Sequence, residues 1–382
     1  LLGTDLDAQT VEDIWRRLGL SFTAWSAGDE GNGTRADGGT GVGWTIHVPS
    51  RRGDLAIEAD LAEEVARLYG YDRIPTSMPE GVLTPGGLNP EQRLRRKVRQ
   101  WFVRRGWTEA ITYSLTDAQS MDEVAPLYKT EHPILLQMPM SEERGRLRTG
   151  LLPHLLDVAE YNRNRKTDSL AVFELGKTFH AQQWPLEQLP DERWALAGLC
   201  TGDWRHHWSG EKEAVDFYFL KGLLEDLFAW LGLDESVTFE PWTEAKGFHP
   251  GRTARCRVGD VTLGMLGQLH PVLAERHHLK ETYVFQLDFD ALTRLAAEKE
   301  ITYRPVPAFP AIQRDLAVIV PETVPAAEVE AVIREAAGQW LERLSLFDVY
   351  RGQPLGESEK SLAFSMLFRD PERTLTDDEV NE

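Results

Sequence analysis

The chain has 382 residues, of which 42% are hydrophobic and 27% are charged, a balance typical of globular proteins. A chain of this length folds as two or three domains, whose cores need no disulfides or metals for stability. The formal net charge of −19 excludes a broadly basic nucleic-acid coat, but it does not exclude a local RNA contact. Cys200 and Cys256 are too few for a disulfide framework, and no apolar run approaches the roughly 20 residues that span a bilayer. We therefore expect a cytoplasmic protein without a membrane partner.

The first segment, residues 1–75, predicts a small domain of helices and strands. Thr10 and Asp13 form a predicted capping pair, and the apolar stripe that follows ends at Gly19, where the helix should stop. The remaining expected elements are a long Gly-rich hairpin or loop over residues 26–43, a strand over residues 44–48 and a helix over residues 57–69.

Four carboxylates are expected to converge beside that second helix: Asp54, Asp60, Glu63 and Glu64. The last three stand at i, i+3 and i+4, so they share one helix face, and the first can reach the same place from the preceding turn. Converging carboxylates repel one another unless a cation lies among them, and hard oxygen donors suit Mg²⁺ or Ca²⁺. Alternatively, Arg67 together with Arg51 or Arg52 neutralises the cluster through salt bridges. The spacing alone leaves both interpretations open.

Residues 76–89 predict a linker, and the helix that follows has a strongly basic face. Asn89 caps this helix, Pro90 takes its first position, Gln92 completes a capping box and Gly106 ends the element. Seven basic side chains lie outside its apolar stripe: Arg93, Arg95, Arg96, Lys97, Arg99, Arg104 and Arg105. Such a run could meet phosphate or an acidic partner, or it could be an ordinary solvated face.

The pattern up to residue 293 predicts an α+β domain around an antiparallel sheet. Gly264 and Gly267 lack the spacing of a phosphate-binding loop, and Cys200 is expected to be a small core residue. The histidine pairs at 206–207 and 277–278 have no ligands at zinc spacing. Strands are expected over residues 170–174, 194–200, 255–258 and 283–288, and a helix over residues 217–231.

The last segment, residues 304–382, has the order strand, helix, strand, strand. The strands are expected over residues 315–320, 346–350 and 361–368, and the helix over residues 325–337. A capping box at Thr376 and Glu379 then announces a further helix. This order predicts a ferredoxin-like βαββαβ unit that lacks its second helix and last strand. Because the sequence also lacks an initiator Met, we expect it to be a fragment of a longer protein.

Motifs distributed in order along the chain resemble the beta subunit of bacterial phenylalanine–tRNA ligases. Residues 52–75 resemble its small, winged-helix-like B5 domain. Residues 147–156, 173–176, 248–254 and 266–271 look like its catalytic-like module of the class II synthetase type. Residues 309–316 and 347–350 are similar to its ferredoxin-fold anticodon-binding domain. The resemblance implies a B5 domain over residues 1–75, a linker over 76–89, a catalytic-like module over 90–293 and a truncated anticodon-binding domain over 304–382.

The resemblance also implies a metal and partners. In the family, the acids at the positions numbered Asp54, Asp60, Glu63 and Glu64 here form a Mg²⁺ site shared with the alpha chain. The family forms an (αβ)₂ tetramer that attaches phenylalanine to tRNA(Phe) using ATP, with adenylate formation in the alpha subunit. No spacing marks Arg146, Arg148 and Arg252 as a triphosphate clamp, so we expect no catalytic residue in this chain and no activity from it alone.

Two departures from the family limit these expectations. The family's oligonucleotide-binding-like and editing regions are absent from this sequence, so editing is not expected of it. Residues 304–382 contain 8 basic and 15 acidic residues, whereas RNA-binding surfaces usually carry a basic patch. Phe364 or Tyr350 could stack on anticodon bases, or both could fill the core. The alternative function is that of a free-standing RNA- or protein-binding paralogue without synthetase activity.

Overall fold

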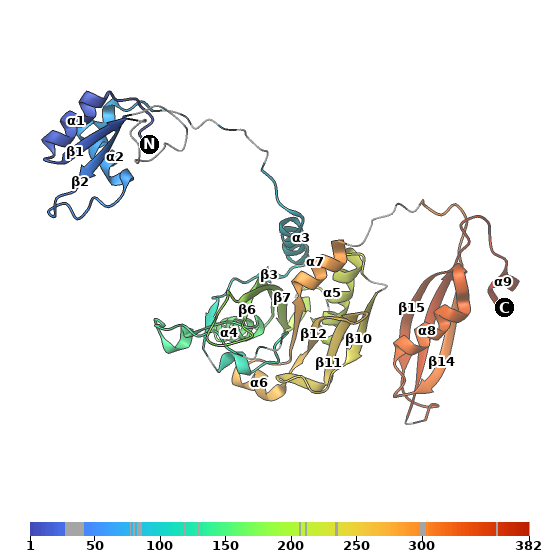
Figure 1. The fold of residues 1–382 in the computed structure, drawn as a ribbon. Helices are drawn as coiled ribbons and strands as arrows, with labels where there is room; N and C mark the ends of the chain where they lie inside the picture. Colours follow the sequence, from blue (N-terminus) through green and yellow to red (C-terminus); the bar gives the residue numbers. More distant parts are fainter. Residues whose placement is uncertain are drawn as a thin grey trace. The chain divides into compact units, whose positions relative to one another are not determined.

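The computed structural model divides into two compact units, Leu1–Gly87 and Leu88–Glu382 (Figure 1). Within the part of the chain that is described, no helix is long and apolar enough to cross a membrane. The described residues are 1–26, 42–76, 78, 81, 86–117, 119–128, 130, 132–205, 208–210, 212–233, 236–297, 303, 305–356 and 358–381.

The first unit packs two helices against a hairpin. Its elements are α1 (Ala8–Arg17), β1 (Ser21–Ser26), β2 (Val42–His47), α2 (Glu58–Tyr69) and the 3-10 turn η1 (Tyr71–Arg73). β1 and β2 pair in antiparallel register, from Ser21 opposite His47 to Ser26 opposite Val42. The apolar faces of all four elements enclose one core, which contains Val11, Ile14, Trp15, Leu20, Leu55 and Val65.

The predicted strand and second helix are therefore confirmed, but the first capping pair is wrong. α1 begins after Asp7, whose carboxylate accepts hydrogen bonds from the Thr10 backbone N–H at 2.8 Å and from its hydroxyl at 2.7 Å. Thr10 is thus the partner of the cap and not the cap itself. The expected hairpin or loop over residues 26–43 is flanked by β1 and β2, and residues 27–41 lie outside the described residues.

The second unit contains a seven-stranded sheet in the order β10-β11-β12-β13-β7-β6-β3. All neighbours are antiparallel except β3 and β6, which run parallel. The strands are β3 (Thr108–Glu109), β6 (Leu170–His180), β7 (Asp191–Thr201), β10 (Val237–Pro241), β11 (Phe248–Val258), β12 (Val261–Leu269) and β13 (Thr282–Asp288). Short paired strands lie outside this sheet: β4 (Leu115–Thr116) with β5 (Arg146–Leu147), and β8 (Asp203–Arg205) with β9 (Glu213–Ala214).

Helices cover both faces of this sheet (Figure 1). α3 (Pro90–Arg104), α5 (Phe217–Trp230) and α7 (Phe289–Ala297) pack on one face, and α4 (Leu152–Arg163) and α6 (Pro271–Arg276) pack on the other. The alternation along β7 divides its side chains accordingly, because Leu196 and Cys200 join the first core whereas Ala197 and Leu199 join the second. Both faces of the sheet are therefore filled by hydrophobic packing.

Two glycines permit this packing in positions where a side chain would collide. A Cβ at Gly198 would lie 2.3 Å from a ring carbon of Phe285, so the missing side chain leaves room for that ring to lie over β7. Gly264 has φ of +157° at a bulge of β12, where a Cβ would lie 2.1 Å from the Gln286 carbonyl oxygen. Both glycines therefore serve the sheet, and β12, like β3 and β10, is a strand that the sequence pattern did not predict.

The end of the chain forms a three-stranded antiparallel sheet in the order β14-β16-β15. Its elements are β14 (Ile312–Pro321), α8 (Ala326–Ala337), β15 (Leu341–Tyr350), β16 (Glu359–Phe368) and α9 (Asp377–Asn381). α8 packs on the sheet through a core of Ile333, Leu344, Leu362 and Phe364. The predicted order is confirmed, including the helix that the Thr376–Glu379 capping box announces, since Glu379 accepts the Thr376 backbone N–H at 2.8 Å.

Candidate functional site

The carboxylate cluster of the first unit is organised by arginines. Arg52 donates to Asp54 at 2.6 Å and to Glu64 at 3.0 Å, so one guanidinium joins the two carboxylates. Arg67 donates to the same oxygen of Glu64 at 2.7 Å. Hydrogen bonds from Arg67 and Arg52 hold the pKa of buried Glu64 below its ordinary value, and those from Arg52 do the same for Asp54. A cation therefore does lie between these acids, and it is a protein side chain.

The other two predicted ligands are placed differently. One carboxylate oxygen of Asp60 accepts the backbone N–H groups of Ala56 at 2.8 Å and Ile57 at 2.9 Å, and these bonds lower the pKa of Asp60. Asp60 thereby satisfies backbone donors at the N-terminus of α2. Glu63 lies on α2 and is exposed. The structure thus brings Asp54 and Glu64 together on Arg52, but it does not bring all four carboxylates together.

The donor set nevertheless fits Mg²⁺ in its chemistry. All four side chains offer anionic oxygens, and Mg²⁺ usually takes one or two carboxylates and keeps several waters. In the arrangement described here, no three acids, histidines or cysteines stand close enough to hold a metal ion. A magnesium ion would therefore have to replace Arg52 between Asp54 and Glu64.

Three of the seven basic side chains at α3 contact other parts of the region built around the seven-stranded sheet, which we call the central module. Arg95 lies over the Trp194 ring at 4.3 Å, Arg99 donates to Glu109 at 2.6 Å, and Arg105 pairs with Asp226 and lies over Trp101 at 3.7 Å. The remaining four cations, Arg93, Arg96, Lys97 and Arg104, are exposed. Their spacing of i, i+3, i+4 and i+11 places them along one outward stripe. The helix therefore offers a narrower cationic surface than its composition suggests.

The three arginines considered for a triphosphate clamp lie close to polar groups of this chain. Arg148 is buried and donates to Glu174 at 2.8 Å and to the Lys177 carbonyl oxygen at 2.8 Å. Arg146 is also buried, 3.9 Å from Asp122. Arg252 donates to Gln268 at 2.9 Å. Arg148 is thus committed to the core of the module, where it neutralises a buried carboxylate.

His277 and the two cysteines also have partners or places inside the folded module. His277 lies between two carboxylates, with Nδ1 2.8 Å from Glu160 and Nε2 3.2 Å from Glu123. Cys200 and Cys256 are fully buried, and burial raises the pKa of both thiols, that of Cys256 to about 12. The pair at 206–207 lies outside the described residues.

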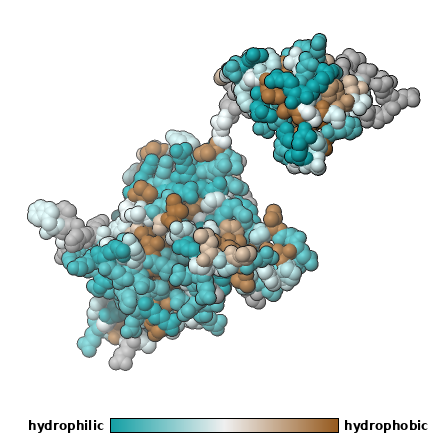
Figure 2. All heavy atoms as spheres, turned by 90° about the vertical axis from the view of Figure 1, so that its left-hand side faces the viewer, coloured by the Kyte–Doolittle hydropathy of each residue, from teal (hydrophilic) through white to brown (hydrophobic). Residues whose placement is uncertain are grey.

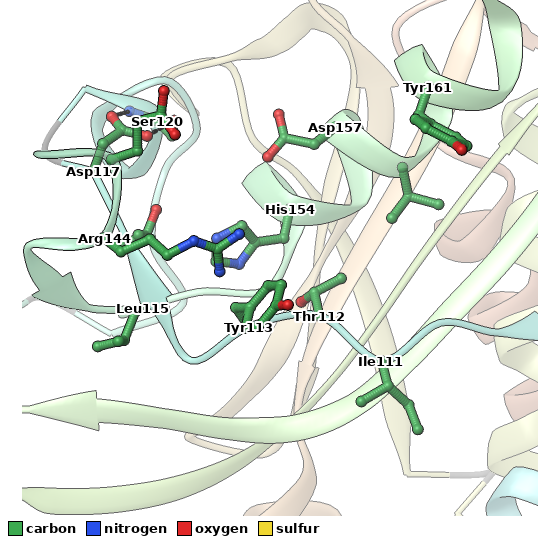
Figure 3. A pocket seen from close by; sticks show the side chains of 13 residues that line it. Ile111, Thr112, Tyr113, Leu115, Asp117, Ser120, Arg144, His154, Asp157 and Tyr161 are labelled. Carbon is green, nitrogen blue, oxygen red and sulfur yellow. Dashed lines mark hydrogen bonds between the residues drawn. The ribbon is translucent and has the colours of Figure 1, made fainter. Parts of the chain in front are cut away.

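A pocket of about 690 Å³ lies on the central module, and sequence reasoning did not find it. Figure 3 shows how Tyr113, Arg144, His154, Asp157 and Tyr161 surround it. These residues come from the segment after β3, from the turn before β5 and from α4. The only signal in the sequence would have been the i, i+3, i+7 spacing of the polar residues on α4. The other two segments form only short strands and single 3-10 turns, so no periodic pattern in the sequence marks them.

In the terminal domain the two candidate stacking residues behave differently. Phe364 is completely buried between the sheet and α8, so it fills the core. Tyr350 is half-exposed, and its hydroxyl donates to the Gln353 carbonyl oxygen at 2.6 Å. Of the two alternatives left open by the sequence, Phe364 fills the core, because a fully packed ring presents no face to a base.

Comparison with known families places these features in one class of protein. The "tRNA synthetase B5 domain" model matches residues 1–71, the "Phenylalanyl tRNA synthetase beta chain CLM domain" model matches residues 74–289, and the "Ferredoxin-fold anticodon binding domain" model matches residues 307–382. The fold and these matches define a component of an aminoacyl-tRNA synthetase.

The relatives are more specific. Over 381 residues the chain is 48% identical to the phenylalanine–tRNA ligase beta subunit of Halalkalibacterium halodurans, covering 99% of this chain and 45% of that protein. The beta subunits of Geobacillus kaustophilus and Bacillus subtilis are 45% and 42% identical, each over 100% of this chain and 45% of the relative. The chain belongs to the phenylalanine–tRNA ligase beta-subunit family. It spans slightly less than half the length of these relatives.

Proposed function

We propose that this chain supports the ATP-dependent attachment of phenylalanine to tRNA(Phe) as part of a beta subunit, while the alpha subunit carries the catalytic residues. The observation that carries this proposal is the order of the three family models, which together match the chain almost from end to end. The packing of helices on both faces of the central sheet and the pairing of Arg148 with Glu174 favour a supporting role. Assembly as an (αβ)₂ tetramer, contact with tRNA(Phe) and a cytoplasmic location belong to the same proposal.

The proposed division of the chain is a B5 domain over residues 1–75, a linker over 76–89, the catalytic-like module over 90–293 and the anticodon-binding domain over 304–382. Local structure supports the second boundary, since Asn89 and Gln92 form the capping box that begins α3. Separate hydrophobic clusters support the division as a whole, because the cores around Ile14 and around Phe364 share no residue with the cores of the seven-stranded sheet.

We propose that the alpha subunit binds the exposed basic stripe on α3. This stripe consists of Arg93, Arg96, Lys97 and Arg104. Four cations at helical spacing in a chain of net charge −19 form a local reversal of charge. Such a reversal attracts an acidic surface and accelerates association at low ionic strength.

We also propose that Asp54, Asp60, Glu63 and Glu64 bind Mg²⁺. The chemistry of the donor set and the convergence of Asp54 and Glu64 on a single guanidinium support this assignment. A bound Mg²⁺ would neutralise the acids and offer its remaining coordination positions to water or to donors of the partner.

The magnesium assignment is tested by the thermal stability of the chain with Mg²⁺ and with a chelator. The double variant Asp60→Asn/Glu64→Gln should lose the dependence on Mg²⁺, because amides are neutral and bind the ion poorly. Glu58→Gln is a matched control, since Glu58 is an exposed acid of the same helix outside the ligand set. If the double variant and the wild type respond equally to Mg²⁺, the four acids are only a salt-bridged surface.

The function as a whole is tested by phenylalanine-dependent ATP–pyrophosphate exchange, with this chain alone and then with its alpha subunit. We expect no exchange from the chain alone and stimulation in the mixture. Exchange from the chain alone would overturn the non-catalytic assignment. Silence in both cases, without a complex on a sizing column, would favour the free-standing binding paralogue.

A further inference from the structure

A second pocket of the central module lies beside α6 and has a volume of about 480 Å³. The residues that line it all come from one stretch, residues 268–281, which runs from the end of β12 through α6 to the turn before β13. The surface in Figure 2 is largely hydrophilic with scattered apolar side chains, so an exposed apolar group alone marks no site. In this pocket the apolar side chains of Leu269, Ala274 and Leu279 are buried instead. We call the cavity the α6 pocket and these three residues its floor.

Gln268 is a buried polar side chain in the lining of the α6 pocket, with only 5% of its surface exposed. Its side-chain oxygen accepts a hydrogen bond from Arg252 at 2.9 Å, which fixes the orientation of the amide. Within the part of the chain that the structure describes, the amide nitrogen has no hydrogen-bond acceptor. Buried N–H groups are normally satisfied. Gln268 therefore offers the pocket two N–H donors that call for an acceptor on a ligand.

His278, which also lines the α6 pocket, occupies a backbone position that favours glycine. It has φ of +54°, its backbone N–H donates to the Glu275 carbonyl oxygen, and the Leu279 N–H donates to the Ala274 carbonyl oxygen. These two bonds form the Schellman motif that ends α6, in which the left-handed residue is usually glycine because a Cβ is unfavourable there. Strained backbone of this kind is typical of functional positions. The imidazole that α6 keeps at this cost faces a cavity where it can donate a hydrogen bond.

Lys280 adds a positive charge to the lining, and no ion pair engages its ammonium group among the described residues. Of the two acids that also line the pocket, Glu281 lies 3.7 Å from the Arg252 guanidinium, and Glu275 is exposed on α6. The groups available to a ligand are therefore mainly hydrogen-bond donors beside a buried apolar floor. Such a combination suits an anionic oxygen acceptor that is attached to an apolar body.

We propose that the α6 pocket binds a small organic carboxylate. Its carboxylate group accepts hydrogen bonds from Gln268, His278 and Lys280, and its carbon chain packs on the floor. A doubly charged phosphate suits the pocket less, since Glu275 and Glu281 belong to the same lining. The site does not depend on the proposed function, and it belongs to a different unit of the chain from the acids proposed to bind Mg²⁺.

The test uses the whole chain, with sodium hexanoate as the probe and hexanamide as its uncharged counterpart, and measures both dissociation constants by ligand-observed NMR. Hexanoate should bind at least fivefold more tightly than hexanamide. Lys280→Gln should weaken hexanoate binding at least fivefold and leave hexanamide binding unchanged, because it removes a charge and keeps the floor. Lys246→Gln is the matched control, since Lys246 is an exposed lysine outside the pocket lining.

Two further variants separate the role of each side chain from that of the backbone. His278→Gly removes the imidazole from a position that glycine prefers, so the thermal unfolding midpoint should not fall, whereas hexanoate binding should weaken. Glu275→Gln removes a nearby negative charge and should tighten hexanoate binding.

The carboxylate site is wrong if hexanoate binds no more tightly than hexanamide. It is also wrong if Lys280→Gln and His278→Gly both bind hexanoate as tightly as Lys246→Gln does. Lys280 is exposed, so its variant should keep the unfolding midpoint of the wild type. Weakened binding at an unchanged midpoint then reports the loss of a ligand contact.

Discussion

At the scale of single residues, Arg148 and Glu174 form a buried ion pair inside the central module. Both side chains are almost fully buried, and the hydroxyl of Thr112 donates to the second Glu174 oxygen at 2.6 Å. Arg148→Met should lower the free energy of unfolding by about 3–5 kcal/mol, because it leaves an uncompensated carboxylate in the core. Urea denaturation of the chain measures this loss.

The companion variant separates the pair from the packing around it. Arg148→Met/Glu174→Gln removes both charges and should recover much of the lost stability, since a neutral amide costs less to bury than an ion. If the double variant is as unstable as Arg148→Met, the loss arises from packing and the ion pair is not its cause.

A second prediction at this scale concerns pH. The ring of His180 is buried between the hydroxyls of Thr130, at 2.8 Å, and Thr178, at 2.9 Å. Burial, together with the nearby positive charge of Arg193, lowers the pKa of His180 to about 4. The unfolded imidazole has a pKa of about 6.5, so between these values the unfolded state binds more protons and stability rises with pH. The free energy of unfolding should therefore fall as pH drops from about 6.5 to about 4.

The measurement is urea denaturation at several pH values, with His180→Gln as the comparison. The slope that His180 contributes is at most about 1.4 kcal/mol per pH unit. The glutamine variant should show a shallower decline, since the carboxylates that titrate in this range are common to both proteins. Equal slopes would show that His180 is protonated in the folded state as readily as in the unfolded one.

At the scale of elements, local signals predicted the structure where they were complete within a few residues. The capping box of Asn89 and Gln92 occurs as expected, because both partners lie within one turn. The cap of α1 was misassigned since Asp7 and Thr10 are both good capping residues, and only the backbone conformation decides between them. β12 escaped prediction because Gly264 and Gly267 weaken a strand pattern, and their role depends on neighbours distant in sequence.

The candidate sites, too, could be predicted only where their residues lie within a few positions of one another in the sequence. Helical spacing alone placed Asp60, Glu63 and Glu64 on α2, as the structure has them. The alternative that Arg52 and Arg67 neutralise the cluster follows from spacing too, and their ion pairs with Glu64 are present. The pocket on the central module could not be predicted, since the segment after β3 and α4 meet only when the sheet has formed.

The capping box allows a prediction for α3. Asn89→Ala removes the acceptor for the Gln92 backbone N–H, a bond of 2.8 Å, and should cost about 1 kcal/mol of stability. Asn89→Asp keeps an acceptor at the same position and should cost less. Thermal unfolding followed by circular dichroism compares the three proteins. Equal midpoints for all three would mean that packing of α3, through Val98, Trp101 and Phe102, fixes the helix without its cap.

At the scale of the whole molecule, the separate cores predict separate unfolding. The core of the unit Leu1–Gly87 is closed within that unit, and Ile14 is almost completely buried in it. Ile14→Ala should cost about 2–5 kcal/mol, and since 1 kcal/mol shifts the midpoint of a domain of this size by roughly 4–8 °C, its transition should fall by about 10 °C or more. Differential scanning calorimetry of the whole chain should show this shift while the transition of the larger unit stays within the change produced by Val332→Ala, an exposed substitution on α8. If both transitions move together, the two units unfold as one cooperative body. The first unit could then not be stabilised by its own metal site independently of the second.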